Sequence, residues 1–306
     1  MYILRTKLLA LIVLANILPL NAAIAAAKVA TDISPPVKEV NQQPALSAAP
    51  VIKKAYNKTS PIQCVSDSES ARASTPLQRL TYKVHHLYPH RTTAFSQGLI
   101  YHKGDIYEST GQYGQSTVSQ LDLKTAAVKQ SYALDKKFFG EGLTLWRDQL
   151  IQLSWKSGKV FRYALKDITL VETQSIRGEG WGITHNGKSL ITSNGSSTLS
   201  FRNPDSLAIE KTLEVSVSGR PLKQLNELEW VNGCILANIW QSQFIAVINP
   251  HSGETTGLID LTRIIQHEQK AGTKGVANGV ALMPESQHLL ITGKNWRGVY
   301  ELEILQ

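Results

Sequence analysis

A glutamate between two glycines is the residue of this sequence best suited to chemistry. It lies in Phe139-Gly140-Glu141-Gly142-Leu143-Thr144, shortly ahead of Gln152-Leu153-Ser154-Trp155-Lys156. The glycines favour tight backbone turns and leave the carboxylate little room to reach solvent. A carboxylate held in this way, with an aromatic residue at the end of the next strand, could transfer protons. Glu141 is therefore the strongest candidate for a catalytic residue.

The layout around Glu141 occurs five times in the chain. Each occurrence starts with a polar residue, which is followed by two short segments typical of strands. The starting residues are 44, 38, 47 and 52 positions apart, and a period of about 40–50 residues built from short strands is typical of a β-propeller. The five starting residues are Gln97, Glu141, Glu179, Asn226 and Asn278.

The segments between these positions have the pattern of β-strands. Short runs of β-branched and aromatic residues alternate with polar ones and end at Gly, Asn or Asp, as in 159–165 and 244–248. Residues 261–270 are the one candidate for a short helix, and 81–86 would supply a strand that closes the ring with the last repeat. We therefore predict an all-β fold, a five-bladed β-propeller over residues 81–306.

The repeat predicts where a site would form. The innermost strand of each propeller blade lines the central channel, so the five starting residues should meet at one mouth of it. The ends of the next strands add Glu108, Trp155, Asn194, Trp240, Lys294 and Trp296. Aromatic walls with a few convergent polar groups are typical of a ligand pocket. Two alternatives remain open, because the polar residues could satisfy backbone groups near the channel and the tryptophans could pack blade against blade.

The first 80 residues differ in composition from the rest. Residues 1–27 have the pattern of an export signal, with Arg5 and Lys7 ahead of an apolar run and small residues at a cleavage site. An uncleaved membrane anchor is the alternative, because the apolar run is close to the shortest length that spans a bilayer. Residues 28–80 hold six of the twelve prolines and few aromatics, which predicts a disordered linker. We expect an exported protein, periplasmic or secreted.

Charge and cysteine usage narrow the possible partners. The net charge of +8 falls to +3 for residues 81–306 once the first 80 are set aside, and no basic cluster with aromatics is present. Nucleic acid is therefore not an expected partner, and a membrane is one only through the leader. Cys64 and Cys234 could form a disulfide in an exported protein or remain two thiols.

The sequence has no CxxC motif and no Cys/His cluster with metal-binding spacing. We predict no metal site. Seven of the eight histidines are expected mostly in loops, and we interpret them as surface residues, not ligands: His85, His86, His90, His185, His251, His267 and His288.

Nine motifs, taken in order from about Tyr82 to the C-terminus, resemble those of the plant- and bacterial-type glutaminyl-peptide cyclotransferases (glutamine cyclotransferases). Any one motif is weak, but the ordered set is specific. They are Ala94-Phe95-Ser96-Gln97-Gly98-Leu99, Tyr107-Glu108-Ser109-Thr110-Gly111-Gln112-Tyr113-Gly114, Phe139 to Thr144, Gln152 to Lys156, Glu179-Gly180-Trp181-Gly182, Leu225-Asn226-Glu227-Leu228-Glu229, Ala237-Asn238-Ile239-Trp240, Asn278-Gly279-Val280-Ala281 and Thr292-Gly293-Lys294-Asn295-Trp296.

The resemblance implies a five-bladed propeller that converts N-terminal glutamine of peptides or proteins to pyroglutamate and releases ammonia, without a cofactor or catalytic metal. It implies that Glu141 is the acidic catalytic residue, here expected to shuttle a proton. The other polar active-site residues it implies are Gln97, Asn226 and Lys294. The residues assigned to substrate binding are Trp155, Trp181, Trp240, Glu108 and Phe95. Ser154 and Asn194 depart from the family pattern, which usually has threonine and often has aspartate there.

Two other functions compete with this one. An exported propeller that only binds a peptide end or a sugar would also have a channel rich in tryptophan, but it would not need a proton shuttle. A calcium-dependent hydrolase or lactonase would gather Glu141, Glu179, Asn226 and Asn278 around a metal. Lys294 could also be structural, paired with a nearby glutamate. We expect the protein to be a monomer whichever of these functions it has.

Overall fold

The computed structural model describes residues 60–64 and 77–305, which all belong to one unit, Tyr56–Gln306. The predicted export signal, residues 1–27, lies outside the described residues, as does most of the predicted linker. Within the part of the chain that is described, no helix is long and apolar enough to cross a membrane.

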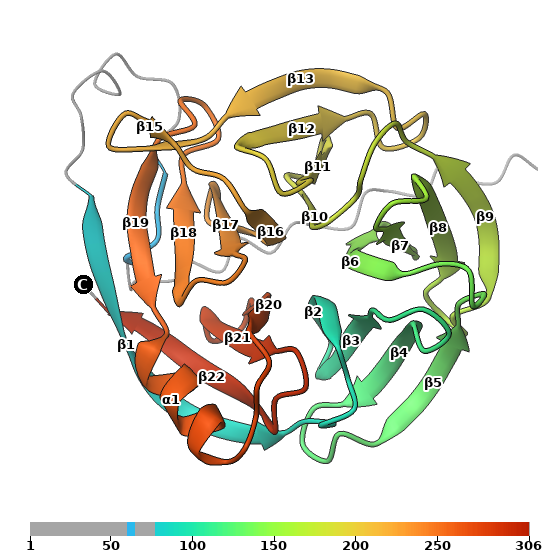
Figure 1. The fold of residues 1–306 in the computed structure, drawn as a ribbon, viewed down its shortest axis with the longest axis horizontal. Coiled ribbons are helices and arrows are strands. Elements are labelled where there is room, and N and C mark those ends of the chain that lie inside the picture. Colours follow the sequence, from blue (N-terminus) through green and yellow to red (C-terminus); the bar gives the residue numbers. More distant parts are fainter. Residues whose placement is uncertain (1–59, 65–76, 306) are drawn as a thin grey trace, which may run out of the picture. The chain divides into compact units, whose positions relative to one another are not determined.

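The described residues are nearly all β, with 22 strands and a single helix. The sheets are arranged around a common centre, and β2, β6, β10, β16 and β20 are the strands nearest to it (Figure 1). The helix, α1 (Thr262–Lys270), confirms the one helix that the sequence predicts.

Three of the sheets have four antiparallel strands each, in sequence order from the centre outwards. The first contains β2 (Ser96–His102), β3 (Asp105–Thr110), β4 (Thr117–Asp122) and β5 (Val128–Ala133). The second contains β6 (Gly140–Trp146), β7 (Gln149–Ser154), β8 (Lys159–Ala164) and β9 (Leu170–Ser175). The third contains β10 (Ile183–His185), β11 (Leu190–Thr192), β12 (Thr198–Arg202) and β13 (Ile209–Glu214). A small hairpin follows, β14 (Ser216–Val217) and β15 (Arg220–Pro221).

The remaining strands form one eight-stranded sheet, in the order β16-β17-β18-β19-β1-β22-β21-β20. Its strands are β1 (Gln78–Pro89), β16 (Leu225–Val231), β17 (Cys234–Ile239), β18 (Phe244–Ile248), β19 (Thr255–Asp260), β20 (Ala277–Met283), β21 (His288–Gly293) and β22 (Gly298–Leu305). The first strand therefore lies between a group of four strands, β16–β19, and a group of three, β20–β22, which it completes as a fourth strand. It pairs in parallel with β19 and antiparallel with β22, from Thr81↔Leu305 to Pro89↔Gly298. The predicted pairing of 81–86 with the last repeat is confirmed, and the strand is longer than predicted.

Burial falls from the centre outwards. Strand β7 is almost entirely buried, whereas the outermost strand of the same sheet, β9, is almost entirely exposed. Neighbouring sheets pack through apolar side chains, for example Tyr107 of the first sheet against Leu150 and Phe161 of the second. Leu99 of the first sheet packs in one cluster with Leu290 of the eight-stranded sheet. The first and last sheets are therefore in contact.

Part of the predicted linker is ordered against the β-sheets. Ile62 is 2% exposed and belongs to the largest apolar cluster, and Cys64 forms a disulfide with Cys234 of β17 across a Cα–Cα distance of 5.1 Å. The sequence alone leaves this pairing open. The prediction of a linker up to residue 80 is wrong for these residues, because a single buried isoleucine and a covalent bond hold a segment whose composition gives no sign of order.

Candidate functional site

Four of the inner strands are irregular where the predicted site residues lie. In β2 the pairing with β3 shifts around Gln97, and the same kind of shift occurs in β6, β16 and β20 around Glu141, Asn226 and Asn278. A bulge redirects a side chain out of the regular alternation of a strand and is common beside active sites. In the fifth inner strand, β10, the corresponding Glu179 lies ahead of the strand.

Glycines let the inner strands approach one another. A Cβ on Gly98 would collide with a backbone nitrogen of β6, and a Cβ on Gly182 would collide with the backbone oxygen of Asn226. A Cβ on Gly142 would lie 2.6 Å from the backbone oxygen of Trp181. Gly142 has no positive φ, so the glycine after Glu141 is required for close approach of the next sheet, not for the tight turn that the sequence predicts.

The inner ends of the sheets enclose a cavity of about 250 Å³. Eight of the nine residues that the resemblance assigns to catalysis or substrate binding line it, although they come from all parts of the domain. The lining residues are Phe95, Gln97, Gln112, Phe139, Glu141, Trp155, Trp181, Asn226, Trp240 and Lys294. Among them are one carboxylate, one ammonium group, three amides and five aromatic rings.

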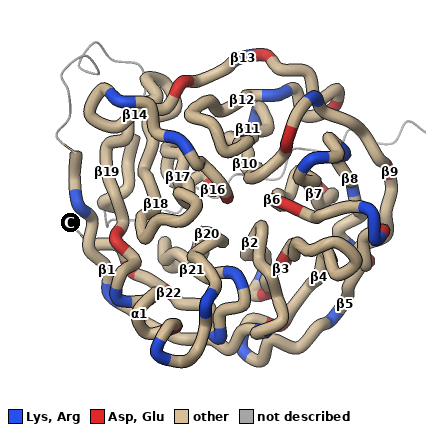
Figure 2. The backbone as a smooth tube through the Cα atoms, in the orientation of Figure 1, with Lys and Arg blue, Asp and Glu red and all other residues tan. Residues whose placement is uncertain are grey.

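The carboxylate and the ammonium group are both buried, with Glu141 5% and Lys294 6% exposed. The pKa of Glu141 is raised well above its usual range, and burial is the main cause. The positive charge of the nearby Lys294 opposes this effect, whereas the negative charge of Glu179 adds to it. Burial lowers the pKa of Lys294, although Glu141 opposes this. The Lys294 Nζ also lies 4.7 Å from the centre of the Phe95 ring, in a cation–π contact. Figure 2 shows acidic positions on β6 and β16 close to the centre.

The tryptophans are held by hydrogen bonds as well as packing. Glu179 Oε2 accepts a bond of 2.9 Å from the indole N–H of Trp155 and another of 2.9 Å from that of Trp181. Trp181 meets Trp240 edge-to-face, with ring centroids 5.7 Å apart. Phe139 packs against Trp155 at 5.6 Å. Glu179 therefore orients two walls of the cavity.

The amides at the site differ in how far they are satisfied. Gln97 Oε1 accepts a hydrogen bond of 3.1 Å from Asn278 Nδ2, which also donates to the backbone oxygen of Ser96. Asn278 is fully buried behind Gln97 and does not line the cavity. The side-chain oxygen of Asn226 is buried and bonds to no described residue. A buried amide oxygen without a hydrogen bond lowers the stability of the fold unless a ligand or water binds it.

Residues 58–304 match the glutamine cyclotransferase family. The chain belongs to this family. It is 38% identical to the glutaminyl-peptide cyclotransferase of Arabidopsis thaliana over 223 residues, which is 72% of this chain and 70% of the plant protein. The crystal structure of Myxococcus xanthus glutaminyl cyclase superposes with a TM-score of 0.71 at 34% identity, and covers 75% of this chain and 100% of the solved one.

In this member of the family, Glu108 is the one residue assigned to catalysis or substrate binding that does not line the cavity. It is completely buried on β3, where Oε1 accepts hydrogen bonds from His90 at 2.7 Å and Ser96 at 2.6 Å, and Oε2 accepts one from Arg91 at 2.8 Å. The assignment of Glu108 to substrate binding is corrected, because its carboxylate is completely buried outside the cavity and both of its oxygens accept hydrogen bonds from neighbouring side chains. Burial disfavours the charge, but these partners outweigh it and lower the pKa of Glu108 to about 2.

The interpretation of His90 as a surface residue is wrong, because the side chain is buried. Its Nδ1 donates to the backbone oxygen of Trp296 at 2.8 Å while its Nε2 faces Glu108, so both ring nitrogens need a proton. Burial lowers the pKa of His90, but Glu108 reverses this and raises it overall. The network joins the segment before Gln97 to the loop after Lys294, and so holds two sides of the cavity.

Two lining residues do not stand out individually in the sequence. Phe139 immediately precedes the Gly-Glu-Gly motif, and its position next to Glu141 is the available signal. Gln112 lies in a turn with a φ of 87°, and the sequence gives no sign that this turn folds over the cavity. Trp296 is expected near the site, but it is fully buried and donates to the backbone oxygen of Gly275.

Two further buried carboxylates lie on the inner strand β16. Glu227 accepts a backbone N–H bond of 2.9 Å from Val280, and Glu229 accepts one of 3.0 Å from Leu282, so both connect β16 to β20. Burial raises the pKa of Glu227 and raises that of Glu229 to about 7. Neither is among the lining residues of the cavity. Because Glu227 and Glu229 accept backbone hydrogen bonds from the neighbouring strand, we interpret both as structural residues.

Proposed function

We propose that this protein is a glutaminyl-peptide cyclotransferase, which converts the N-terminal glutamine of peptides or proteins to pyroglutamate and releases ammonia. The observation that carries the proposal is a small cavity in which one buried carboxylate with a raised pKa lies among aromatic walls and amides. Membership of the glutamine cyclotransferase family supports the same reaction. A protein that only bound peptide ends would have no need of a buried carboxyl group able to exchange protons.

The reaction is intramolecular. The α-amine nitrogen attacks the side-chain carbonyl carbon of the same glutamine, a new C–N bond forms, and the bond from that carbon to the amide nitrogen breaks. Walls of Trp155, Trp181 and Trp240 suit a substrate folded back on itself, because flat, rigid rings exclude water and restrict the chain. Holding the reactive conformer in this way supplies a large part of the rate.

Glu141 is proposed to move the proton. The attacking amine must lose a proton and the leaving amide nitrogen must gain one to depart as ammonia, so one carboxyl group can accept the first and donate the second. A carboxyl group does this best when its pKa lies near the working pH. Burial of Glu141 raises its pKa in that direction.

The negative charge that develops on the carbonyl oxygen needs donors. Lys294 and the amides of Gln97 and Asn226 line the same cavity. We propose that they donate hydrogen bonds to this oxygen. Each such donor typically contributes about 3 kcal/mol to lowering the barrier. The buried oxygen of Asn226, which bonds to no described residue, would accept from the amine or amide of the substrate.

We further propose that the five groups of strands are five blades of one β-propeller. Three blades are the four-stranded sheets, and β1 joins the other two into the eight-stranded sheet. The leader suggests that the protein is exported to the periplasm or secreted. The single carboxylate of the cavity, with an ammonium group beside it, is a poor donor set for calcium, which favours six to eight oxygen ligands. This argues for a reaction without metal at the cavity.

The test uses the purified full chain, a short peptide with N-terminal glutamine and an ammonia assay in the presence of EDTA. We expect ammonia release together with loss of the free amino terminus. The matched control is the same peptide with an acetylated amine, which should release no ammonia because the nucleophile is blocked. Release from the acetylated peptide would indicate a deamidase, and activity that returns only with added calcium would indicate a metal-dependent enzyme. No release by folded protein would favour a binding propeller.

A further inference from the structure

A second group of reactive side chains lies on the eight-stranded sheet, outside the catalytic cavity. His85 comes from β1, His288 from β21 and Glu303 from β22, the strand that pairs with both of the others. The pairing of β1 with β22 shifts around His85, and Leu289↔Leu302 places His288 opposite Glu303 one step further along. Three strands therefore direct these side chains to one place.

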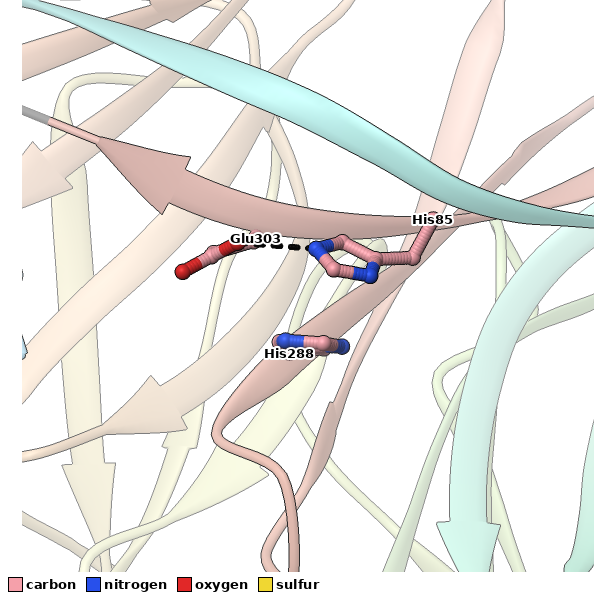
Figure 3. Close-up of side chains that lie close together, drawn as sticks. All are labelled: His85, His288 and Glu303. Atoms are coloured by element: carbon pink, nitrogen blue, oxygen red, sulfur yellow. Dashed lines mark hydrogen bonds and ion pairs between the residues drawn. The ribbon is translucent and has the colours of Figure 1, made fainter.

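The three side chains converge closely. His85 Nε2 and Glu303 Oε2 are 2.8 Å apart, and the two imidazole rings are 4.4 Å apart between centroids (Figure 3). One ligand atom from each residue lies within 4.8 Å of the other two. Tetrahedral coordination with bonds of about 2.0–2.2 Å requires ligand atoms roughly 3.4 Å apart. Small side-chain movements would reach that geometry, and the side chain of His85 is 33% exposed and able to move.

The surroundings of His288 favour its use as a ligand. Its Nδ1 donates a hydrogen bond of 2.7 Å to Glu301 Oε1, and Glu301 Oε2 in turn accepts one of 2.8 Å from the Tyr88 hydroxyl. Histidines that bind metals usually donate their other ring N–H to a carboxylate, which fixes the tautomer and the ring orientation. Coordination through Nε2 would leave this arrangement of His288, Glu301 and Tyr88 in place.

We propose that His85, His288 and Glu303 form a binding site for Zn²⁺ or a similar divalent transition metal that links strands of the sheet. Two imidazole nitrogens and one carboxylate oxygen suit such ions better than they suit calcium or magnesium, which favour oxygen ligands. Water would complete the coordination. The ion would connect β1 to β21 and β22, where the first strand of the domain meets the last two. None of the three residues lines the catalytic cavity, so the site is independent of the reaction. This revises the interpretation of both histidines as plain surface residues.

The test is calorimetric titration of ZnCl₂ into the full chain after EDTA has been removed by dialysis. We expect one ion per chain and at least tenfold weaker binding in His85→Ala, His288→Ala and Glu303→Gln. The matched control is His86→Ala, which removes an exposed imidazole next to His85 on the same strand but outside the group of three. It should bind zinc like the wild type.

A second readout separates a structural ion from a catalytic one. Zinc should raise the melting temperature of the wild type by a few degrees and leave that of His85→Ala unchanged, because binding to the folded state alone stabilises it. Ammonia release should be the same with and without zinc. The proposal is overturned if the wild type binds no zinc, if the double variant His85→Ala/His288→Ala binds it equally well, or if His86→Ala loses binding as the proposed ligands do.

Discussion

At the scale of single residues, the site depends on a few charges that the fold keeps out of water. Glu141 lies among aromatic side chains, and its pKa reflects the balance between burial, Lys294 and Glu179. Glu179 has two effects, since it holds the indoles of Trp155 and Trp181 and also places a negative charge near Glu141. The properties of the proposed catalytic carboxyl group therefore depend on a residue that does not line the cavity.

Glu179→Gln should move the acid limb of the pH–rate profile to lower pH. The charge of Glu179 raises the pKa of Glu141, so its removal lowers that pKa and ionised Glu141 persists in more acidic solution. The limb due to the substrate amine should not move, because the peptide is the same. We also expect kcat/KM to fall about tenfold, because the neutral amide oxygen is a weaker shared acceptor for the two indole N–H groups and holds the tryptophans less firmly. The measurement is ammonia release against pH, with Glu210→Gln as a remote control. A shift of the acid limb to higher pH would contradict the account.

Glu108→Gln should destabilise the domain at neutral pH by about 3–5 kcal/mol, because His90 and Arg91 lose a buried partner. The pKa of Glu108 is lowered to about 2 in the folded state. Its stabilising effect is therefore complete above the unfolded pKa, near 4.5, and is lost as the pH falls towards 2. Urea unfolding at pH 7 and pH 3 should show the difference between variant and wild type shrinking in acid. A difference that stays constant would argue against an ionised Glu108.

At the scale of elements, the site is produced by bulges and glycines at the starts of the inner strands. The repeat of polar residues is visible in the sequence, and so are the strands and the helix at 261–270. The bulge around Glu141 is not, because pairing register depends on the partner strand. The burial of Glu108 could not be predicted either, since its partners His90 and Arg91 come from a loop whose path only the fold determines.

Gly182→Ala should destabilise the domain by about 2–3 kcal/mol and lower activity. The added Cβ would collide with the backbone oxygen of Asn226 in the next sheet, and overpacking of this kind forces backbone shifts. The control is Gly187→Ala, where nothing lies within 4 Å of the added atom and only the left-handed backbone conformation is strained, at a cost of about 1 kcal/mol. Chemical denaturation and ammonia release measure the two effects. Equal losses in both variants would contradict the close approach of the sheets.

At the scale of the whole domain, closure depends on segments far apart in the sequence. Strand β1 lies between β19 and β22, and the Cys64–Cys234 disulfide joins the segment before it to β17 across 170 positions. The pairing of 81–86 with the last repeat followed from the need to complete a ring. The pairing of β1 with β19 and the disulfide could not be predicted from the sequence, because nothing in the composition of residues 28–80 shows which of them contact the sheets.

Reduction of the disulfide should lower the free energy of unfolding by about 2–5 kcal/mol, because it removes a constraint on a long loop of the unfolded chain. A thermal melt with and without dithiothreitol measures this. The double variant Cys64→Ser/Cys234→Ser should melt at the temperature of the reduced wild type and should not respond to dithiothreitol. A wild type insensitive to reduction would show that the disulfide does not contribute to stability.

The most direct test of the central claim is the rate of ammonia release from an N-terminal glutamine peptide by Glu141→Gln beside the wild type. The amide keeps the shape of the side chain but cannot carry the proton, so we predict a loss in kcat of about 10³-fold or more, with a melting curve no less stable than that of the wild type. Activity within tenfold of the wild type in this variant would show that Glu141 is not the proton carrier and that the chemistry of the cavity has been assigned to the wrong residue.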